Sequence, residues 1–64
     1  MCLATVYNKN EEPECVILEY VSKMEVDGES ITLTDVMGQR KVVEGTIKMV
    51  DLANGIVRLN CFAF

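Results

Sequence analysis

Apolar and polar positions alternate along much of the chain, and this period of two predicts β-strands. The longest example is 15–26, where apolar residues occupy most even positions and charged residues stand at odd ones. We expect its core-facing row to be Val16, Leu18, Tyr20, Met24 and Val26. Further strands are expected at 2–7, 30–36 and 41–52, with a last one that ends at Cys61.

Two turn dipeptides predict how neighbouring strands pair. Asp27-Gly28 suits a two-residue hairpin turn in which both central residues have positive φ, which would set Met24 opposite Ile31. Asn54-Gly55 has the same character. It would pair Val50 with Leu59 and place an Asp51–Arg58 ion pair on the outer face.

The apolar parity changes between Gly45 and Met49, which predicts a bulge or sharp bend there. Five short strands, tight turns and no helix of consequence predict an all-β fold. We expect a small five-stranded, partly open SH3/Sm-like barrel, with two packed sheets as the alternative. The whole chain, 1–64, is expected to form one domain.

The composition suggests self-association. Half of the 64 residues (50%) are hydrophobic, which exceeds what so small a core can hide. We therefore expect a homodimer.

Charge and cysteine content exclude several classes. A net charge of −4 repels phosphate backbones and anionic lipids, so we expect neither nucleic acid nor a membrane as partner. No secretion signal or membrane-spanning run is recognisable, and the three cysteines form no regular framework. We expect a cytoplasmic protein with reduced thiols.

The chemical lead is the thiol of Cys2 beside the start of the chain. The Met1 amine, the Cys2 amide nitrogen and the Cys2 sulfur can close two fused chelate rings. If Met1 is removed, the Cys2 amine and sulfur chelate directly and the Leu3 amide can join. Either set suits square-planar Ni(II) or Cu(II). The alternative is a structural Cys2 that starts an inward row with Ala4 and Val6.

Other chemistry has little support. The chain lacks histidine and any C-x-x-C pair, and no nucleophile and base stand together, so we expect no enzyme. We interpret Cys15 and Cys61 first as small, buried hydrophobic residues. Cys61 is kept as a second candidate sulfur ligand, because closing a small barrel could bring the first and last strands together.

Two segments carry a family resemblance: Met1-Cys2-x-Ala4-x-Val6 at the start, and EGTIKMVDLxxGIxxL over 44–59. Together they resemble the CooT family of small nickel-binding proteins associated with maturation of nickel-containing carbon monoxide dehydrogenase. The resemblance implies a small barrel, a homodimer and nickel bound through Cys2. It thus implies a metallochaperone or nickel store that serves a nickel metalloenzyme.

Two alternatives without a metal stay open. One is a protein-interaction module that docks through a strand edge or through Phe62 and Phe64. The other is RNA binding, a label that some members of the family carry, although the acidic balance argues against it.

Overall fold

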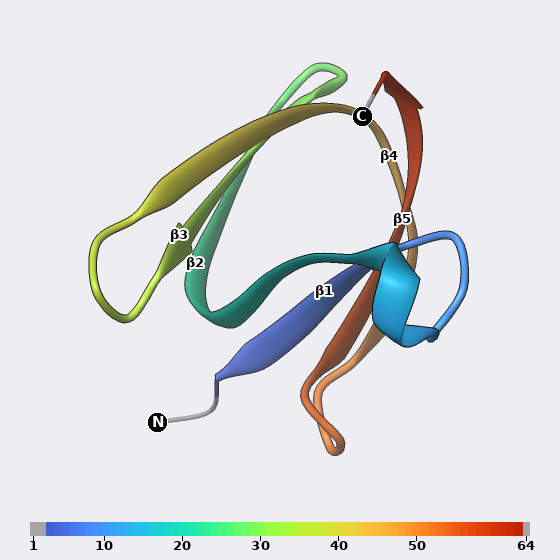
Figure 1. Ribbon diagram of the computed structural model, residues 1–64. Coiled ribbons are helices and arrows are strands. Elements are labelled where there is room, and N and C mark those ends of the chain that lie inside the picture. Colours follow the sequence, from blue (N-terminus) through green and yellow to red (C-terminus); the bar gives the residue numbers. More distant parts are fainter. Residues whose placement is uncertain (1–2, 64) are drawn as a thin grey trace.

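A computed structural model describes residues 3–63, while Met1, Cys2 and Phe64 lie outside the described part (Figure 1). Within that part the chain forms five strands and one short 3-10 helix, η1. Their bounds are β1 Ala4–Asn8, η1 Pro13–Cys15, β2 Val16–Asp27, β3 Ser30–Asp35, β4 Arg40–Asp51 and β5 Ile56–Ala63. No helix among residues 3–63 is long and apolar enough to cross a bilayer.

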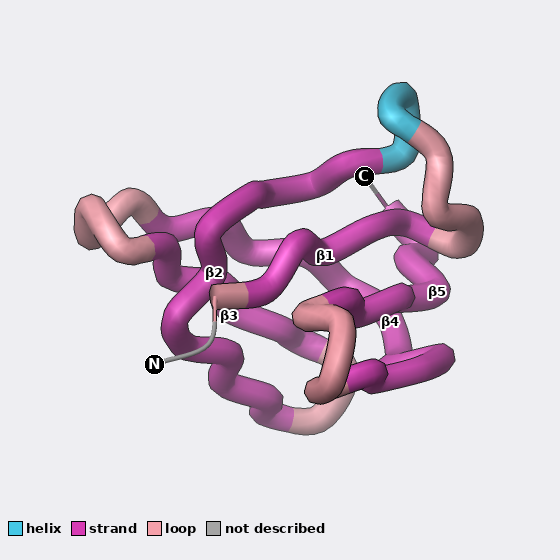
Figure 2. Tube along the Cα trace, turned by 90° about the horizontal axis from the view of Figure 1, so that it is seen from below, coloured by secondary structure: helices cyan, strands magenta, loops and turns pink. Residues whose placement is uncertain are grey.

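The strands form a ring in the order β1-β2-β3-β4-β5, in which consecutive strands pair antiparallel (Figures 1 and 2). The ring closes because β1 also pairs with β5, in parallel, from Thr5 opposite Ile56 to Asn8 opposite Leu59. Closure leaves few strand edges exposed to other chains. The predicted all-β, five-stranded barrel is confirmed.

Every strand contributes to one apolar core inside the ring. The buried set comprises Val6, Ile17, Val21, Ile31, Leu33, Val43, Val57, Leu59 and Cys61. Val6, Ile31, Leu33 and Leu59 have no exposed surface at all. Because side chains alternate between the faces of a strand, this interior is reached by every second residue of each straight segment.

The predicted inward row of β2 is wrong at Tyr20 and Val26, whereas Leu18 and Met24 pack against the core as predicted. The structure buries Ile17 and Val21, while Tyr20 is 62% and Val26 53% exposed. The ribbon of β2 bends sharply along its length (Figure 1). Tyr20 takes a left-handed conformation, with φ of 56°, and the register of β2 with β3 shifts just after Val21. A bulge of this kind reverses which parity faces the core, so Met24 returns to the inner side.

The β2–β3 turn lies one residue later than predicted. Its two residues are Gly28, with φ of 62°, and Glu29, which is not in a left-handed conformation. Glycine at the first central position with only that φ positive is typical of a type II′ turn. Met24 consequently pairs with Leu33 and not with Ile31.

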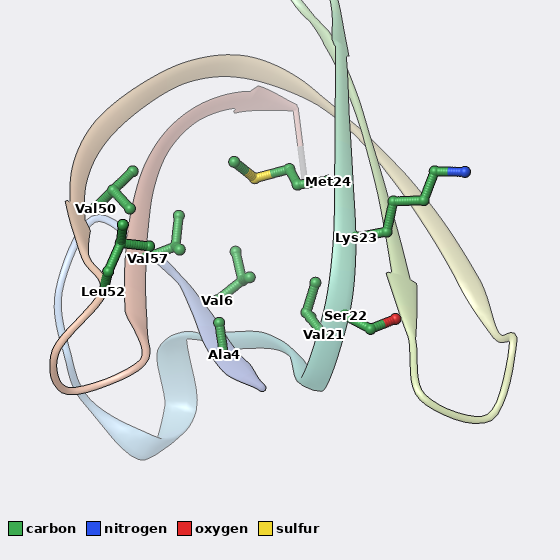
Figure 3. Close-up of a pocket in the computed structure, with 9 residues that line it drawn as sticks. All are labelled: Ala4, Val6, Val21, Ser22, Lys23, Met24, Val50, Leu52 and Val57. Atoms are coloured by element: carbon green, nitrogen blue, oxygen red, sulfur yellow. The ribbon is translucent and has the colours of Figure 1, made fainter. Parts of the chain in front are cut away.

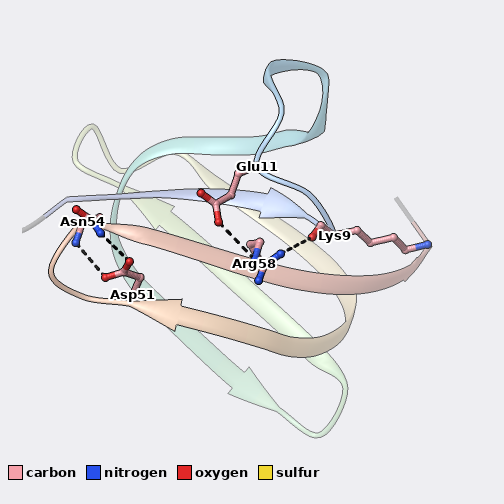
Figure 4. A network of polar contacts seen from close by, with 5 residues as sticks. All are labelled: Lys9, Glu11, Asp51, Asn54 and Arg58. Carbon is pink, nitrogen blue, oxygen red and sulfur yellow. Dashed lines mark hydrogen bonds and ion pairs between the residues drawn. The ribbon is translucent and has the colours of Figure 1, made fainter.

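The predicted β4–β5 turn and its ion pair are also wrong. The turn spans 52–55, and the Asp51 carboxylate accepts hydrogen bonds from the backbone N–H of Asn54 (3.1 Å) and from its Nδ2 (2.8 Å) (Figure 4). This side-chain bonding favours a longer loop over a two-residue one. Val50 therefore pairs with Val57.

Arg58 does not pair with Asp51. Its Nε instead lies 3.6 Å from Glu11, and its Nη1 donates a 3.5 Å hydrogen bond to the carbonyl of Lys9 (Figure 4). Because β5 is displaced by two residues relative to the predicted register, this arginine faces the loop after β1.

The predicted bulge in β4 is confirmed. The β4–β5 register shifts between Glu44 and Gly45 and again between Ile47 and Met49. A β-carbon at Gly45 would clash with the Asn60 carbonyl oxygen, so the two backbones come closer here than any residue other than glycine allows.

Candidate metal centre

The start of β1 is fixed against the β4–β5 turn. The backbone N–H of Thr5 donates a 2.9 Å hydrogen bond to the carbonyl of Gly55. A β-carbon at Gly55 would lie 2.8 Å from the Leu3 carbonyl oxygen, so the two segments are in backbone contact. The chain therefore enters the barrel at a defined place, beside the end of β4.

An apolar opening lies at this end of the barrel (Figure 3). It encloses about 210 Å³ and is lined by Ala4, Val6, Val21, Ser22, Lys23, Met24, Val50, Leu52 and Val57. We call it the mouth. The Met24 side chain extends across it toward Val57, whereas the polar ends of Ser22 and Lys23 point away (Figure 3). The mouth is therefore an apolar surface, with no polar group directed into it from these residues.

The sequence did not single out the mouth. Leu52 is 80% exposed and Val50 45% exposed, yet both are large and aliphatic. The sequence did offer one signal. Val50 and Leu52 are apolar residues at even positions after the parity change in β4, and neither belongs to the buried core. The mouth forms because β5 pairs with both β1 and β4, which brings residues of these distant strands to the same end of the barrel.

The predicted ligands fall in three different places. Met1 and Cys2 lie outside the described residues. Leu3 is half-buried at the entry to β1, one residue before Ala4, which lines the mouth. Leu3 therefore directly precedes a residue that lines the rim of the mouth.

The structure does not bring Cys61 to that end. The strand that follows Cys2 in the sequence, β1, and the strand that carries Cys61, β5, are neighbours, as the hypothesis required, but they run parallel. Cys61 lies five residues beyond Ile56, the partner of Thr5, which is about 16 Å along β5. Its backbone N–H donates to the Asn8 side chain at 3.2 Å, at the far end of β1.

The Cys61 thiol is also poorly suited to bind a metal. It is buried in the core, and this burial raises its thiol pKa, an effect that the nearby Lys9 ammonium only partly offsets. A raised pKa keeps the sulfur protonated at neutral pH, whereas a metal binds the thiolate. Over residues 3–63, no three Cys, Asp or Glu side chains are grouped so that they could hold an ion.

Comparison with known proteins decides the family. The family model of the CO dehydrogenase accessory protein CooT matches residues 1–60. The chain belongs to the CooT family. The resemblance seen in the first residues and in 44–59 is thereby confirmed.

A solved CooT-family structure has the same fold. It is a crystal structure from Carboxydothermus hydrogenoformans, described there as a candidate CooT, with 32% sequence identity and a TM-score of 0.80. The match covers 92% of this chain and 95% of that one. A search of the curated proteins finds no significant match.

Membership of the CooT family gives the coarse role. The family is described as accessory to CO dehydrogenase, so this CooT-family chain is an accessory protein by family and is not described as an enzyme. A metalloenzyme partner fits that description.

Proposed function

We propose that this CooT-family protein binds Ni(II) through Cys2 and stores it for, or transfers it to, a nickel metalloenzyme of the carbon monoxide dehydrogenase type. The observation that carries the proposal is the fixed entry of β1 at the rim of the mouth. It fixes Leu3 and Thr5, which follow the Met-Cys start of the sequence that the family match includes, against Gly55 at one end of the barrel.

The donor set suits nickel as cargo. A thiolate with an amine and deprotonated amides of Met1, Cys2 or Leu3 offers the sulfur and nitrogen ligands of a square-planar ion. Within the described part of the chain no alternative group of three acidic or thiol ligands exists, which directs attention to the start of the chain. Affinity should fall as pH falls, because protons compete for the thiolate and nitrogen donors.

The mouth supports the homodimer. Its aliphatic rim, above all Leu52, is exposed in the single chain. Two copies placed mouth to mouth would cover these side chains and bring their chain starts together. One Ni(II) could then be shared by two Cys2 thiolates.

Titration of the protein with Ni(II) tests the site. The protein is produced without an N-terminal extension, because any added residue moves the amine away from the sulfur. A sulfur-to-nickel charge-transfer band should appear in the wild type, vanish in Cys2→Ser and persist in the matched Cys15→Ser control. Nickel binding that survives Cys2→Ser would falsify the proposed ligand.

Sedimentation tests the dimer. Leu52→Asp should give a monomer at micromolar concentration, because a carboxylate cannot be buried in an apolar interface. Val42→Asp is the control, since Val42 is 61% exposed on β4 but does not line the mouth. A Leu52→Asp protein that remains dimeric would refute association through the mouth.

A further inference from the structure

The side chain of Met24 brings a sulfur atom into the mouth. Met24 is half-buried against the core, and its thioether extends across the opening toward Val57 (Figure 3). Among the described residues that line the mouth, it alone carries sulfur. The others are aliphatic except Ser22 and Lys23, whose polar ends point away (Figure 3). The thioether is therefore the one metal-binding group that these side chains direct into the mouth.

The mouth leaves the thioether room to move. The opening encloses about 210 Å³, so neighbours do not surround the far end of Met24 on every side. Methionine has three rotatable side-chain bonds and a polarizable sulfur, and it adapts readily to irregular space. The sulfur can therefore turn toward a bound ion without displacing the core.

Met24 also lies at the end of the barrel where β1 begins. Because β1 and β2 are antiparallel and Ala4 pairs with Val21, β2 runs on to Met24 at the end where β1 starts. Ala4 and Met24 both line the mouth. Cys2 precedes Ala4 by two residues, and two residues span at most about 7 Å. This length of chain allows a Cys2 thiolate to reach the mouth that contains the Met24 sulfur.

The chemistry of the two sulfurs selects the ion. Thiolate and thioether ligands are soft and favour Cu(I), whereas square-planar Ni(II) favours the nitrogen donors at the start of the chain. Charge favours the same ion. One thiolate and one Cu(I) form a neutral pair, and a thioether adds no charge, so the complex can lie in an apolar opening at little cost in solvation. A divalent ion on the same two sulfurs would keep a net positive charge there.

We propose that Cys2 and Met24 form a Cu(I) site at the mouth, in which the Cys2 thiolate and the Met24 thioether hold one ion per chain. Binding replaces the proton of the Cys2 thiol, which passes to solvent, and neither copper nor sulfur changes its oxidation state. The inference rests on the proposed function for the role of Cys2 as a metal ligand. The part played by Met24 is inferred from its place in the mouth.

Methionine methyl NMR tests the ligand in the unaltered protein. The protein is produced without an N-terminal extension, labelled with [methyl-13C]methionine and titrated with Cu(I) under anaerobic conditions. The Met24 methyl resonance should shift as the ion binds, whereas those of Met37 and Met49, which do not line the mouth, should stay in place. A Met24 resonance that does not move, or no binding of Cu(I) at all, overturns the proposal.

Competition with bicinchoninate measures the Cu(I) affinity of variants. Met24→Leu nearly keeps the side-chain volume and removes the sulfur, so it should bind Cu(I) at least about tenfold more weakly and Ni(II) within about twofold of the wild type. Met49→Leu is the matched control, because Met49 is also half-buried but lies on β4 outside the mouth, and it should change neither affinity. Equal Cu(I) affinity of the two variants overturns the role of Met24.

The two proposals fail separately. If the wild type never shows a nickel band but binds Cu(I) through Cys2 and Met24, nickel binding is refuted and the Cu(I) site stands. If Cys2→Ser loses nickel while the Met24 methyl resonance of the wild type ignores Cu(I), the proposed function stands and the Cu(I) site is overturned.

Discussion

The carbonyl oxygen of Leu3 lies 2.8 Å from the position that a β-carbon would take at Gly55. The parallel β1–β5 pairing begins at this contact, with the Thr5 N–H bonded to the Gly55 carbonyl. The residue that ends the β4–β5 turn thus also closes the barrel and positions the entry of the chain. The first prediction concerns this contact.

Gly55→Ala should destabilise the protein by about 3 kcal/mol, because the methyl group meets backbone and the φ of 67° is strained for alanine. Gly28→Ala is the control, with a φ of 62° and nothing within 4 Å of its β-carbon. It should cost about 1 kcal/mol, from strain alone. Urea unfolding measures both, and equal losses would show that the Leu3 contact contributes nothing.

Tyr20→Asn should stabilise the fold by about 0.5–1 kcal/mol. Asparagine tolerates the left-handed conformation better than tyrosine does, and the exposed ring buries little surface. Chemical denaturation tests this effect, and a loss of stability would mean that the ring packs more tightly than its exposure indicates.

Asn54 should control the acidity of Asp51. Its side-chain and backbone hydrogen bonds lower the pKa of the Asp51 carboxyl below 3.8. A lowered folded-state pKa adds stability above the unfolded-state value, and this is lost as pH falls through the folded-state pKa. Asn54→Ala should raise the Asp51 pKa toward 3.8 in an NMR titration of the carboxyl carbon, whereas Asn60→Ala should leave it unchanged. An unmoved pKa in Asn54→Ala would contradict the assignment.

The Cys61 thiol should be slow to react. In a Cys2→Ser background, iodoacetamide at pH 8 should modify Cys61 at least tenfold more slowly than Cys15, since Cys61 is buried and its thiol pKa is raised. Mass spectrometry of timed samples gives both rates. Equal rates would indicate that the end of β5 opens readily.

The raised pKa of Cys61 also predicts a pH effect on stability. Its contribution is fully present below the unfolded-state value near 9.0 and is lost as pH rises through the folded-state pKa. Compared with Cys61→Ala, the wild type should therefore lose stability in alkaline solution. If the stabilities of the two proteins change with pH in the same way above pH 9, the thiol pKa of Cys61 is not raised.

The turn dipeptides show how far local sequence reaches. Glycines at 28 and 55 do adopt positive φ, as their turn preferences indicate. Whether the neighbouring residue joins the turn depended on hydrogen bonds that local preference does not describe, such as those between Asp51 and Asn54. Each hairpin register consequently differed from its prediction by two residues, which kept the inward parity but changed every partner.

The sequence alone determined the all-β class, the number of strands, the bulge near Gly45 and the family, because alternation, turn residues and a recognisable motif are local properties. Tertiary structure decided the rest. The parallel β1–β5 closure placed Cys61 beside Asn8, at the far end of β1 from Ala4, and the register shift after Val21 changed which residues of β2 face the core. The mouth exists only because residues far apart in sequence pair across the ring, which no local pattern specifies.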